Sequence, residues 1–304
     1  MTTTVLVVDD ITTNVKLLEA RLTNENYNVI TAYNGADALA ICMGQNIDVI
    51  LSDVMMPHID GFELCSRLKS NVKTKNIPFI LITGLEEECH KAQALKIGAD
   101  DFLTKPINEV TLLTRVKNLL IQKNLKDEIA RIKEETDKED KKGEDPQSLI
   151  ASVNLNAAGR ILLVDACGRV ISRVLPLLSE THNVFVQTAH SQALQTLNEY
   201  RFDVLLMHVC ESSEETLQFC STLRANNKTE QLPILLITEA ESQELIMGLN
   251  YGVNDYVLYP IDRLDVMARL KVQITNKRLK DYIESISKGS TLKYLFNKAS
   301  LKKP

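Results

Sequence analysis

The most constraining feature of the sequence is an internal repeat: segments of its first half return in its second half, 154 to 156 residues later. Near the start, VLVVDDITTN is matched by RILLVDACGRV, and further along NIDVILSDVMM is matched by RFDVLLMHVCE. A chain of 304 residues is long enough for roughly two domains of about 150 residues each. Because self-similarity at a fixed offset indicates repeated structural units, the two halves are predicted to share one fold.

Strands and helices alternate along the first half. Short apolar runs are separated by segments with helical spacing, as where Val15, Leu18 and Leu22 share one helix face. The alternation predicts the α/β class, with a parallel sheet and helices on both faces. The predicted strands are 5–8, 29–32, 47–51, 78–83 and 101–104, and the predicted helices are 14–25, 36–43, 62–68, 86–97 and a segment from 109.

Chemically distinctive side chains lie at the ends of these predicted strands. Asp9 and Asp10 follow the first apolar run, and Asp53 follows the third. Thr83 ends the fourth, and Lys105 follows the fifth. The carboxyl ends of parallel strands share one edge, where such sheets bind ligands, so these side chains are predicted to converge. Carboxylates so close together repel unless a cation is present, and Mg²⁺ prefers hard oxygen ligands of this kind.

The chemistry predicted from this set is phosphoryl transfer onto Asp53. A carboxylate can form an aspartyl-phosphate, and Lys105 supplies a positive charge suited to a phosphoryl oxygen. The Thr83 hydroxyl can donate to another oxygen, and positioning with charge neutralisation does most of the catalysis. Each residue alone has a simpler structural interpretation, because a strand-end aspartate commonly caps the next helix. The ordered combination favours the functional interpretation.

Residues 4–121 resemble a response-regulator receiver domain of two-component signalling. The resemblance rests on the pair Asp9-Asp10, the DVMMPHIDG loop around Asp53, Thr83 and Lys105 with its following proline. It implies a flavodoxin-like (CheY-like) doubly wound sheet with five parallel strands in the order 2-1-3-4-5. It also implies that Asp53 receives a phosphoryl group from a sensor histidine kinase or a phosphotransfer protein.

The same resemblance implies roles for the residues near Asp53. Asp10 and Asp53 would bind Mg²⁺ through their side chains, and Asp9 mainly through water. Met55 would add its backbone carbonyl as a further ligand.

A switch is implied by the resemblance as well. Thr83 would move toward the phosphate, and Phe102, three residues before Lys105, would repack with it. Members of the family often have tyrosine at the position of Phe102; phenylalanine can rotate inward but lacks the hydroxyl. A local charge change would thereby bias a bistable surface.

The second copy has kept its apolar framework and lost most of its reactive groups. Asp165 matches Asp9, but Ala166 stands where Asp10 stands, and His208 stands at the position of Asp53. Tyr259 replaces Lys105, whereas Thr238 is kept. A Mg²⁺ site of the first type is therefore excluded here. His208 is left with three interpretations: a phosphohistidine, a metal ligand or, as is more common for a lone histidine at a buried strand end, a satisfied core residue.

An intact receiver followed by a degraded one resembles the PleD type of response regulator. In that type the second receiver acts as an adaptor in phosphorylation-driven dimerisation, and a GGDEF diguanylate cyclase domain follows. No GG[DE]EF string occurs in this sequence. Because the second copy keeps its apolar framework and has lost its reactive groups, it is predicted to serve as a packing surface.

Four segments are predicted along the chain. Charge of both signs dominates after Ile132, which is typical of a solvated helix end and flexible linker; a dimer seam through Leu113, Val116 and Leu120 is the alternative. The basic end is a helix extension and tail or a segment that binds a partner or a membrane surface. The segments are a phosphoacceptor receiver at 1–124, a charged helical linker at 125–158, a degenerate receiver at 159–276 and a basic C-terminal helix or tail at 277–304.

Composition excludes several other classes of protein. The net charge of −5 provides no basic field for nucleic acid. The six cysteines are scattered without CxxC spacing, as expected of packing thiols in a reducing compartment. The start lacks a signal-peptide pattern, and no apolar stretch is long enough to span a membrane. A cytoplasmic location is predicted.

The sequence therefore predicts a non-enzymatic signalling protein. Phosphorylation of Asp53 with Mg²⁺ would drive homodimerisation or docking to an output domain or effector, with the second receiver as adaptor. Two alternatives stay open: the regulatory portion of a diguanylate cyclase whose GGDEF domain is missing here, and a phosphate-sink relay.

Overall fold

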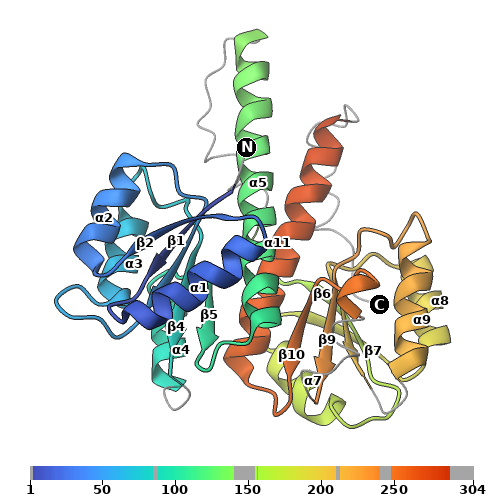
Figure 1. Ribbon diagram of the computed structural model, residues 1–304. Helices are drawn as coiled ribbons and strands as arrows, with labels where there is room; N and C mark the ends of the chain where they lie inside the picture. The colour runs from blue at the N-terminus through green and yellow to red at the C-terminus, as the bar shows by residue number, and fades with distance from the viewer. Residues whose placement is uncertain are drawn as a thin grey trace. The chain divides into compact units, whose positions relative to one another are not determined.

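The computed structural model describes residues 3–84, 88–139, 155, 157–209, 213–239 and 248–287 (Figure 1). The chain divides into two compact units, residues 1–123 and residues 124–304. Part of the predicted linker, at 140–154 and 156, and the tail at 288–304 lie outside the described residues. Among the described helices, none combines the length and the apolarity needed to cross a bilayer.

The first unit alternates strand and helix throughout its described residues, as the apolar periodicity predicts. Its last helix, α5, begins in this unit and ends in the next. The elements are β1 (Thr4–Val8), α1 (Thr12–Asn24), β2 (Asn28–Ala32), α2 (Gly35–Gly44), β3 (Val49–Asp53), α3 (Gly61–Ser70), β4 (Phe79–Thr83), α4 (Glu88–Lys96), β5 (Asp101–Thr104) and α5 (Glu109–Glu139).

The second unit repeats this order in the residues that the structure describes. Its elements are β6 (Arg160–Val164), α7 (Ile171–Ser179), β7 (Asn183–Gln187), α8 (His190–Glu199), β8 (Val204–His208), α9 (Ser213–Arg224), β9 (Ile234–Thr238), β10 (Asp255–Leu258) and α11 (Arg263–Ser287).

Both sheets are five-stranded and parallel, and both confirm the predicted strand order. The strand order is β2-β1-β3-β4-β5 in the first sheet and β7-β6-β8-β9-β10 in the second. Strands β6 to β10 thus occupy the same positions in their sheet as β1 to β5 do in theirs. In the first sheet Val8 pairs with Ser52, so the residues after β1 and at the end of β3 lie side by side. In the second, Val164 pairs with Met207, which places Asp165 beside His208.

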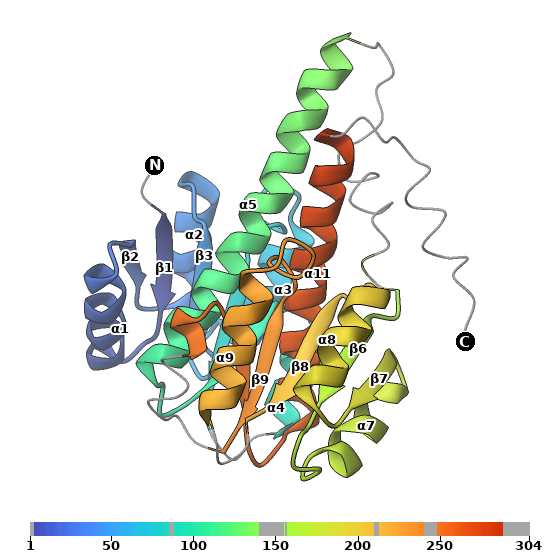
Figure 2. The same ribbon diagram turned by 90° about the vertical axis from the view of Figure 1, so that its right-hand side faces the viewer.

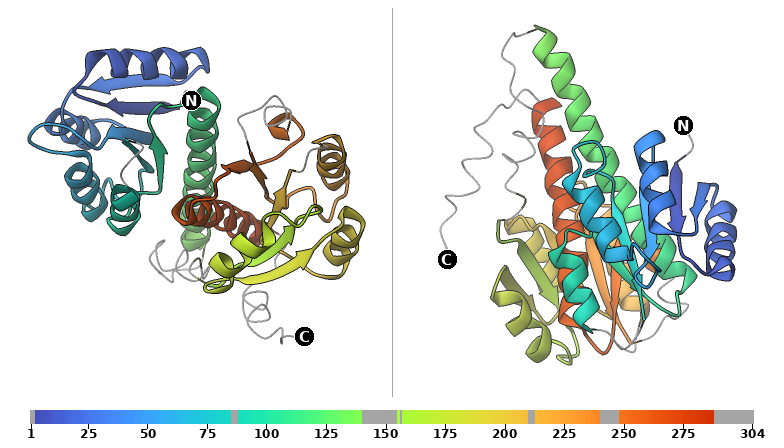
Figure 3. Two further views of the ribbon diagram at one scale, coloured as in Figure 1. Left: turned by 90° about the horizontal axis from the view of Figure 1, so that it is seen from below. Right: turned by 90° about the vertical axis from the view of Figure 1, so that its left-hand side faces the viewer.

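The central strands of the first sheet, β1, β3 and β4, are buried on both faces, which explains their largely apolar sequences. Leu6, Ile50 and Leu81 belong to a core cluster on the face covered by α2, α3 and α4, while α1 contacts β1 and β2 from the other face (Figures 1 and 3). All three side chains are fully buried, and each contributes about 1.5–3 kcal/mol relative to an exposed position.

The second unit has the same layers. Side chains of β6, β8, β9 and β10 form a core cluster with α7 and α11, and α8 contacts β6 and β7. Figure 2 shows α8 and α9 in front of this sheet. The loss of reactive residues in this copy has therefore left its framework intact.

Two helices extend beyond the receiver-like core of the second unit. Ile129 of α5, which lies on the second unit's side of the boundary, packs with Leu279 and Tyr282 of α11. Figures 1 and 2 both show these helix ends side by side. Residues 125–132 of the predicted linker, which precede its charged stretch, therefore contribute apolar side chains to a small core with α11.

Candidate functional site

Three carboxylates meet at the carboxyl edge of the first sheet. Asp9 and Asp10 follow β1, and Asp53 is the last residue of β3. One oxygen from each lies within 4.8 Å of the others. Asp9 and Asp53 are buried, whereas Asp10 is exposed, so the cluster opens to solvent on one side.

Lys105 provides positive charge at this cluster. Its Nζ lies 2.6 Å from Asp53 Oδ1 and 3.5 Å from Asp9 Oδ2. The lysine follows β5 directly, and its backbone N–H donates to the carbonyl of Thr83 (2.8 Å), which holds the two strand ends together. The structure thus brings together four of the residues that the sequence singled out, from the ends of three strands.

Burial and charge alter the proton affinity of this group. Burial raises the pKa of Asp53, Lys105 opposes this, and the nearby Asp9 and Asp10 add to it. For Lys105, burial would lower the pKa, but its contacts with Asp53 and Asp9 outweigh burial and raise it. The lysine therefore stays charged, while the aspartate takes up a proton more readily than an ordinary carboxyl group.

The loop after Asp53 turns back against the strand. Gly61 donates its N–H to the carbonyl of Val54 (2.9 Å), and a Cβ on Gly61 would lie 2.2 Å from the backbone oxygen of Asp53. Glycine is required here because no side chain fits between the two backbones. Met55 lies within this loop, and the residue is 67% exposed.

The two predicted switch residues lie on neighbouring strands. Thr83 ends β4 and is buried, and Phe102 in β5 is also buried. Lys91 of α4 places its Nζ 5.5 Å from the centre of the Phe102 ring, a cation–π distance. The described geometry therefore ties β5 to α4 next to the carboxylate cluster.

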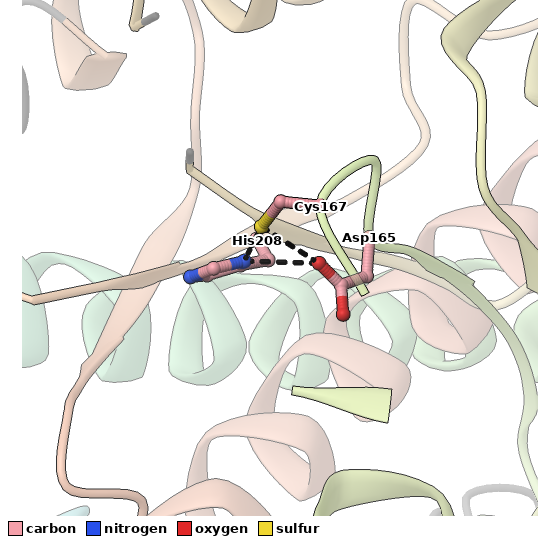
Figure 4. Close-up of side chains that lie close together, drawn as sticks. All are labelled: Asp165, Cys167 and His208. Carbon is pink, nitrogen blue, oxygen red and sulfur yellow. Dashed lines mark hydrogen bonds and ion pairs between the residues drawn. The ribbon is translucent and has the colours of Figure 1, made fainter. Parts of the chain in front are cut away.

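The equivalent edge of the second sheet carries a different cluster, Asp165, Cys167 and His208 (Figure 4). His208 Nδ1 lies 3.0 Å from Asp165 Oδ1 and 3.2 Å from Cys167 Sγ. The backbone N–H groups of Val170 and Ile171 donate to Asp165 Oδ2 at 2.8 and 3.1 Å. Burial would raise the pKa of Asp165, but these hydrogen bonds outweigh it and lower the pKa.

Two side-chain contacts at these sheet edges were not predicted from the sequence. Asn14 donates to Asp9 Oδ2 (3.0 Å), which orients that carboxylate, and Cys167 contacts His208. The repeat could have indicated the contact of Cys167 with His208. Cys167 follows Asp165 by two residues, and the repeat offset aligns His208 with Asp53.

The other described cysteines separate into two kinds. Cys42, Cys65 and Cys220 are buried, and burial raises the pKa of these thiols to about 11, 12 and 11 respectively. These three fit the predicted packing role. Cys89 is exposed, as is Cys167, and Cys210 lies outside the described residues.

The chain matches a known protein family. The response regulator receiver domain model matches the chain twice, at residues 5–117 and 161–271. The chain belongs to the response regulator receiver family. It therefore contains two receiver domains of a two-component response regulator in tandem, as the repeat predicted.

Individual members of the receiver family agree with this result. Response regulator PleD of Caulobacter vibrioides is 37% identical over 289 residues, which cover 94% of this chain and 62% of PleD. The chain thus spans less than two thirds of that relative. Response regulator ArlR of Staphylococcus aureus is 37% identical over 125 residues, covering 41% of this chain and 56% of ArlR.

Among solved structures, the chemotaxis response regulator CheY4 of Vibrio cholerae is similar to part of the chain. It is 32% identical, with a TM-score of 0.38, and the match covers 39% of this chain and 99% of CheY4.

Proposed function

We propose that the first receiver accepts a phosphoryl group on Asp53 and transmits this event through its switch residues. The observation that supports the proposal most directly is the geometry at Asp53. A buried carboxylate at a strand end lies 2.6 Å from the ammonium of Lys105, with Asp9 and Asp10 beside it. The phosphoryl donor is a sensor histidine kinase or a phosphotransfer protein.

The carboxylate cluster fits Mg²⁺. Asp9, Asp10 and Asp53 offer hard oxygen donors within 4.8 Å of one another, which suits a cation that binds few protein carboxylates and retains waters. The backbone carbonyl of Met55 is proposed as a further ligand. When bound, Mg²⁺ would supply the positive charge that offsets the carboxylates and the incoming phosphoryl oxygens.

The chain's own residues would carry out the transfer. An Asp53 carboxylate oxygen attacks phosphorus, the P–N bond to the donor histidine breaks, and the leaving nitrogen takes a proton. Lys105 then leaves its contact with the Asp53 oxygen for a phosphoryl oxygen. The Thr83 hydroxyl donates to a second phosphoryl oxygen, because it ends the neighbouring strand.

The switch would act through β4, β5 and α4. Movement of Thr83 toward the phosphate frees space next to Phe102, whose ring already lies within the protein and near Lys91. Repacking there changes the surface formed by α4, β5 and the start of α5. That surface then pairs with a second chain or docks to an output domain or effector, with the second receiver as adaptor.

Removal of divalent metal is expected to destabilise the first receiver and stop its phosphorylation. At a Mg²⁺ concentration about 100 times Kd, binding adds about 2.7 kcal/mol to the free energy of unfolding. Because burial raises the pKa of Asp53, protons compete with Mg²⁺ at a higher pH than for an ordinary carboxyl group. The stabilisation should therefore fade as pH falls through that pKa, which thermal unfolding with Mg²⁺ or with EDTA measures.

The control for this metal effect is His208→Ala, which alters the other sheet edge. Its Mg²⁺-dependent stabilisation should equal that of the wild type, whereas Asp10→Ala should reduce it. Loss of the Mg²⁺ effect in His208→Ala would overturn the assignment of the metal to the first receiver.

Phosphorylation-dependent dimerisation is tested by light scattering. Beryllofluoride with Mg²⁺ mimics the phosphoryl group, so the scattering mass should double in the wild type and stay unchanged in Asp53→Asn. A monomer under both conditions would remove dimerisation from the proposal and leave docking to a separate effector.

A second candidate function is the regulatory portion of a diguanylate cyclase. It is favoured by the match to PleD, of which this chain spans 62%. The gene sequence beyond codon 304 distinguishes the candidates: a GGDEF coding region supports a cyclase, and a stop codon removes it. A phosphate-sink relay, the third alternative, would lose phosphate from Asp53 quickly, whereas a switch would retain it.

A further inference from the structure

The second receiver holds three side chains of metal-binding type where the first holds its carboxylates. Asp165 follows β6, Cys167 lies two residues further, and His208 ends β8. We propose that Asp165, Cys167 and His208 form a site for a thiophilic divalent transition metal, with Zn²⁺ as the ion that fits best. The site is separate from the proposed Mg²⁺ site and does not depend on it.

The distances among the donor atoms support a common ligand. Oδ1 of Asp165 and Nδ1 of His208 are 3.0 Å apart, and Sγ of Cys167 lies 3.2 Å from that nitrogen and 3.3 Å from that oxygen. In a tetrahedral zinc site, metal–ligand bonds of about 2.0–2.3 Å place the donors roughly 3.3–3.6 Å apart. Shifts of a few tenths of an ångström would therefore accommodate the ion.

The three atoms converge on one point, as Figure 4 shows, and do not form a chain. In a nucleophilic triad, the nucleophile and the carboxylate contact opposite nitrogens of the imidazole ring, so that one nitrogen accepts the proton of the nucleophile while the carboxylate orients the ring through the other. Here Cys167 Sγ and Asp165 Oδ1 both contact Nδ1 of His208. The geometry thus favours shared coordination over a relay.

Neighbouring backbone groups orient one of the three ligands, and one side of the cluster is open to solvent. Asp165 directs Oδ2 to the backbone N–H groups of Val170 and Ile171, which fixes the carboxylate and leaves Oδ1 facing the other two donors. Such supporting hydrogen bonds are typical of protein metal sites. Asp165 and His208 are buried but Cys167 is exposed, so metal and a water ligand can enter from the Cys167 side.

The donor set selects the metal. One sulfur, one imidazole nitrogen and one carboxylate oxygen suit Zn²⁺, while Mg²⁺ favours oxygen ligands alone. Three protein ligands leave a fourth position for water or an added group. The two receivers would therefore bind ions of different chemical classes without competing for them.

Cobalt spectroscopy on the full-length, reduced, metal-free chain tests the proposal. Co²⁺ occupies zinc sites, and a thiolate ligand adds a charge-transfer band in the near ultraviolet. The titration should show this band at a single equivalent, and Zn²⁺ should abolish it. Mass spectrometry of dialysed protein should find a single zinc ion per chain, and Zn²⁺ should raise the unfolding temperature.

Variants assign the site. Cys167→Ser should remove the charge-transfer band, and both Cys167→Ser and His208→Gln should weaken Zn²⁺ binding by about 100-fold or more, at least as much as loss of a supporting group. Cys89→Ser, at the other exposed described cysteine, is the matched control and should change neither result. Asp53→Asn removes one carboxylate of the first receiver's cluster and should also leave the band intact.

Three outcomes would overturn the proposal. They are the absence of bound Zn²⁺ at micromolar concentration, a thiolate band that survives Cys167→Ser, and unchanged zinc affinity in His208→Gln. Circular dichroism of each variant establishes that it is folded. If Cys167→Ser fails to fold, the exchange of Co²⁺ for Zn²⁺ in the wild type and the zinc affinity of His208→Gln still test whether the site exists.

Discussion

Replacing Asp53 by asparagine is expected to abolish covalent phosphorylation of the chain. Acetyl phosphate with Mg²⁺ should add a single phosphoryl group to the wild type, and peptide mass spectrometry should locate it on residue 53. Asparagine has nearly the same shape but lacks the anionic nucleophile, so incorporation should fall to background. The buried position of Asp53 beside Lys105 makes it the expected acceptor.

The matched control is Asp60→Asn, seven residues along the same loop. Asp60 caps α3 by accepting a hydrogen bond from the Glu63 N–H (2.7 Å), and asparagine caps helices about equally well. This variant should be phosphorylated like the wild type. Phosphate on another residue in Asp53→Asn, or labelling at residue 53 in metal-free buffer, would contradict the proposed function.

Gly61→Ala is expected to be the most destabilising glycine-to-alanine change in the described part of the first receiver. Its added methyl group would lie 2.2 Å from the backbone oxygen of Asp53, which no rotation of a side chain can relieve. We expect a loss of about 3 kcal/mol or more in the free energy of unfolding. The unfolding temperature should fall by roughly 10 °C, and phosphorylation should weaken because the strand end must shift.

Gly44→Ala provides the comparison. Gly44 ends α2, and a Cβ there would meet nothing within 4 Å. Alanine should be neutral or stabilise by up to about 1 kcal/mol, because it reduces the freedom of the unfolded chain. Urea unfolding followed by circular dichroism compares the two variants directly. Equal stability in both would show that the loop after Asp53 relaxes more easily than its geometry indicates.

The sequence predicted the sheet edge because two independent regularities coincide there. Apolar runs buried on both faces mark the strands, and the βαβ pattern allows only a parallel sheet, so Asp53, Thr83 and Lys105 had to come to one edge. Because the second half repeats the first, the same strand arrangement was predicted for the second unit. Sheet order in both units follows the prediction.

Contacts made by loops could not be predicted in the same way. Asn14 reaches Asp9, and Cys167 reaches His208, through turns whose conformation no periodic pattern specifies. Helix length was equally hard to judge, because α5 continues to Glu139 through a strongly charged stretch. The packing of Ile129 on α11 was equally unpredictable, because Leu279 and Tyr282 lie far away in the sequence.

The ion pair between Lys105 and Asp53 has a consequence for how the first receiver assembles. Carboxylates that are brought together at the edge of a sheet repel one another, and this repulsion would ordinarily oppose folding until a cation was bound. The lysine acts as an internal counter-ion, with its Nζ 2.6 Å from Asp53 Oδ1. We therefore expect the polypeptide to reach its native state in magnesium-poor surroundings, so that the Mg²⁺ binding proposed above would be a later event governed by concentration.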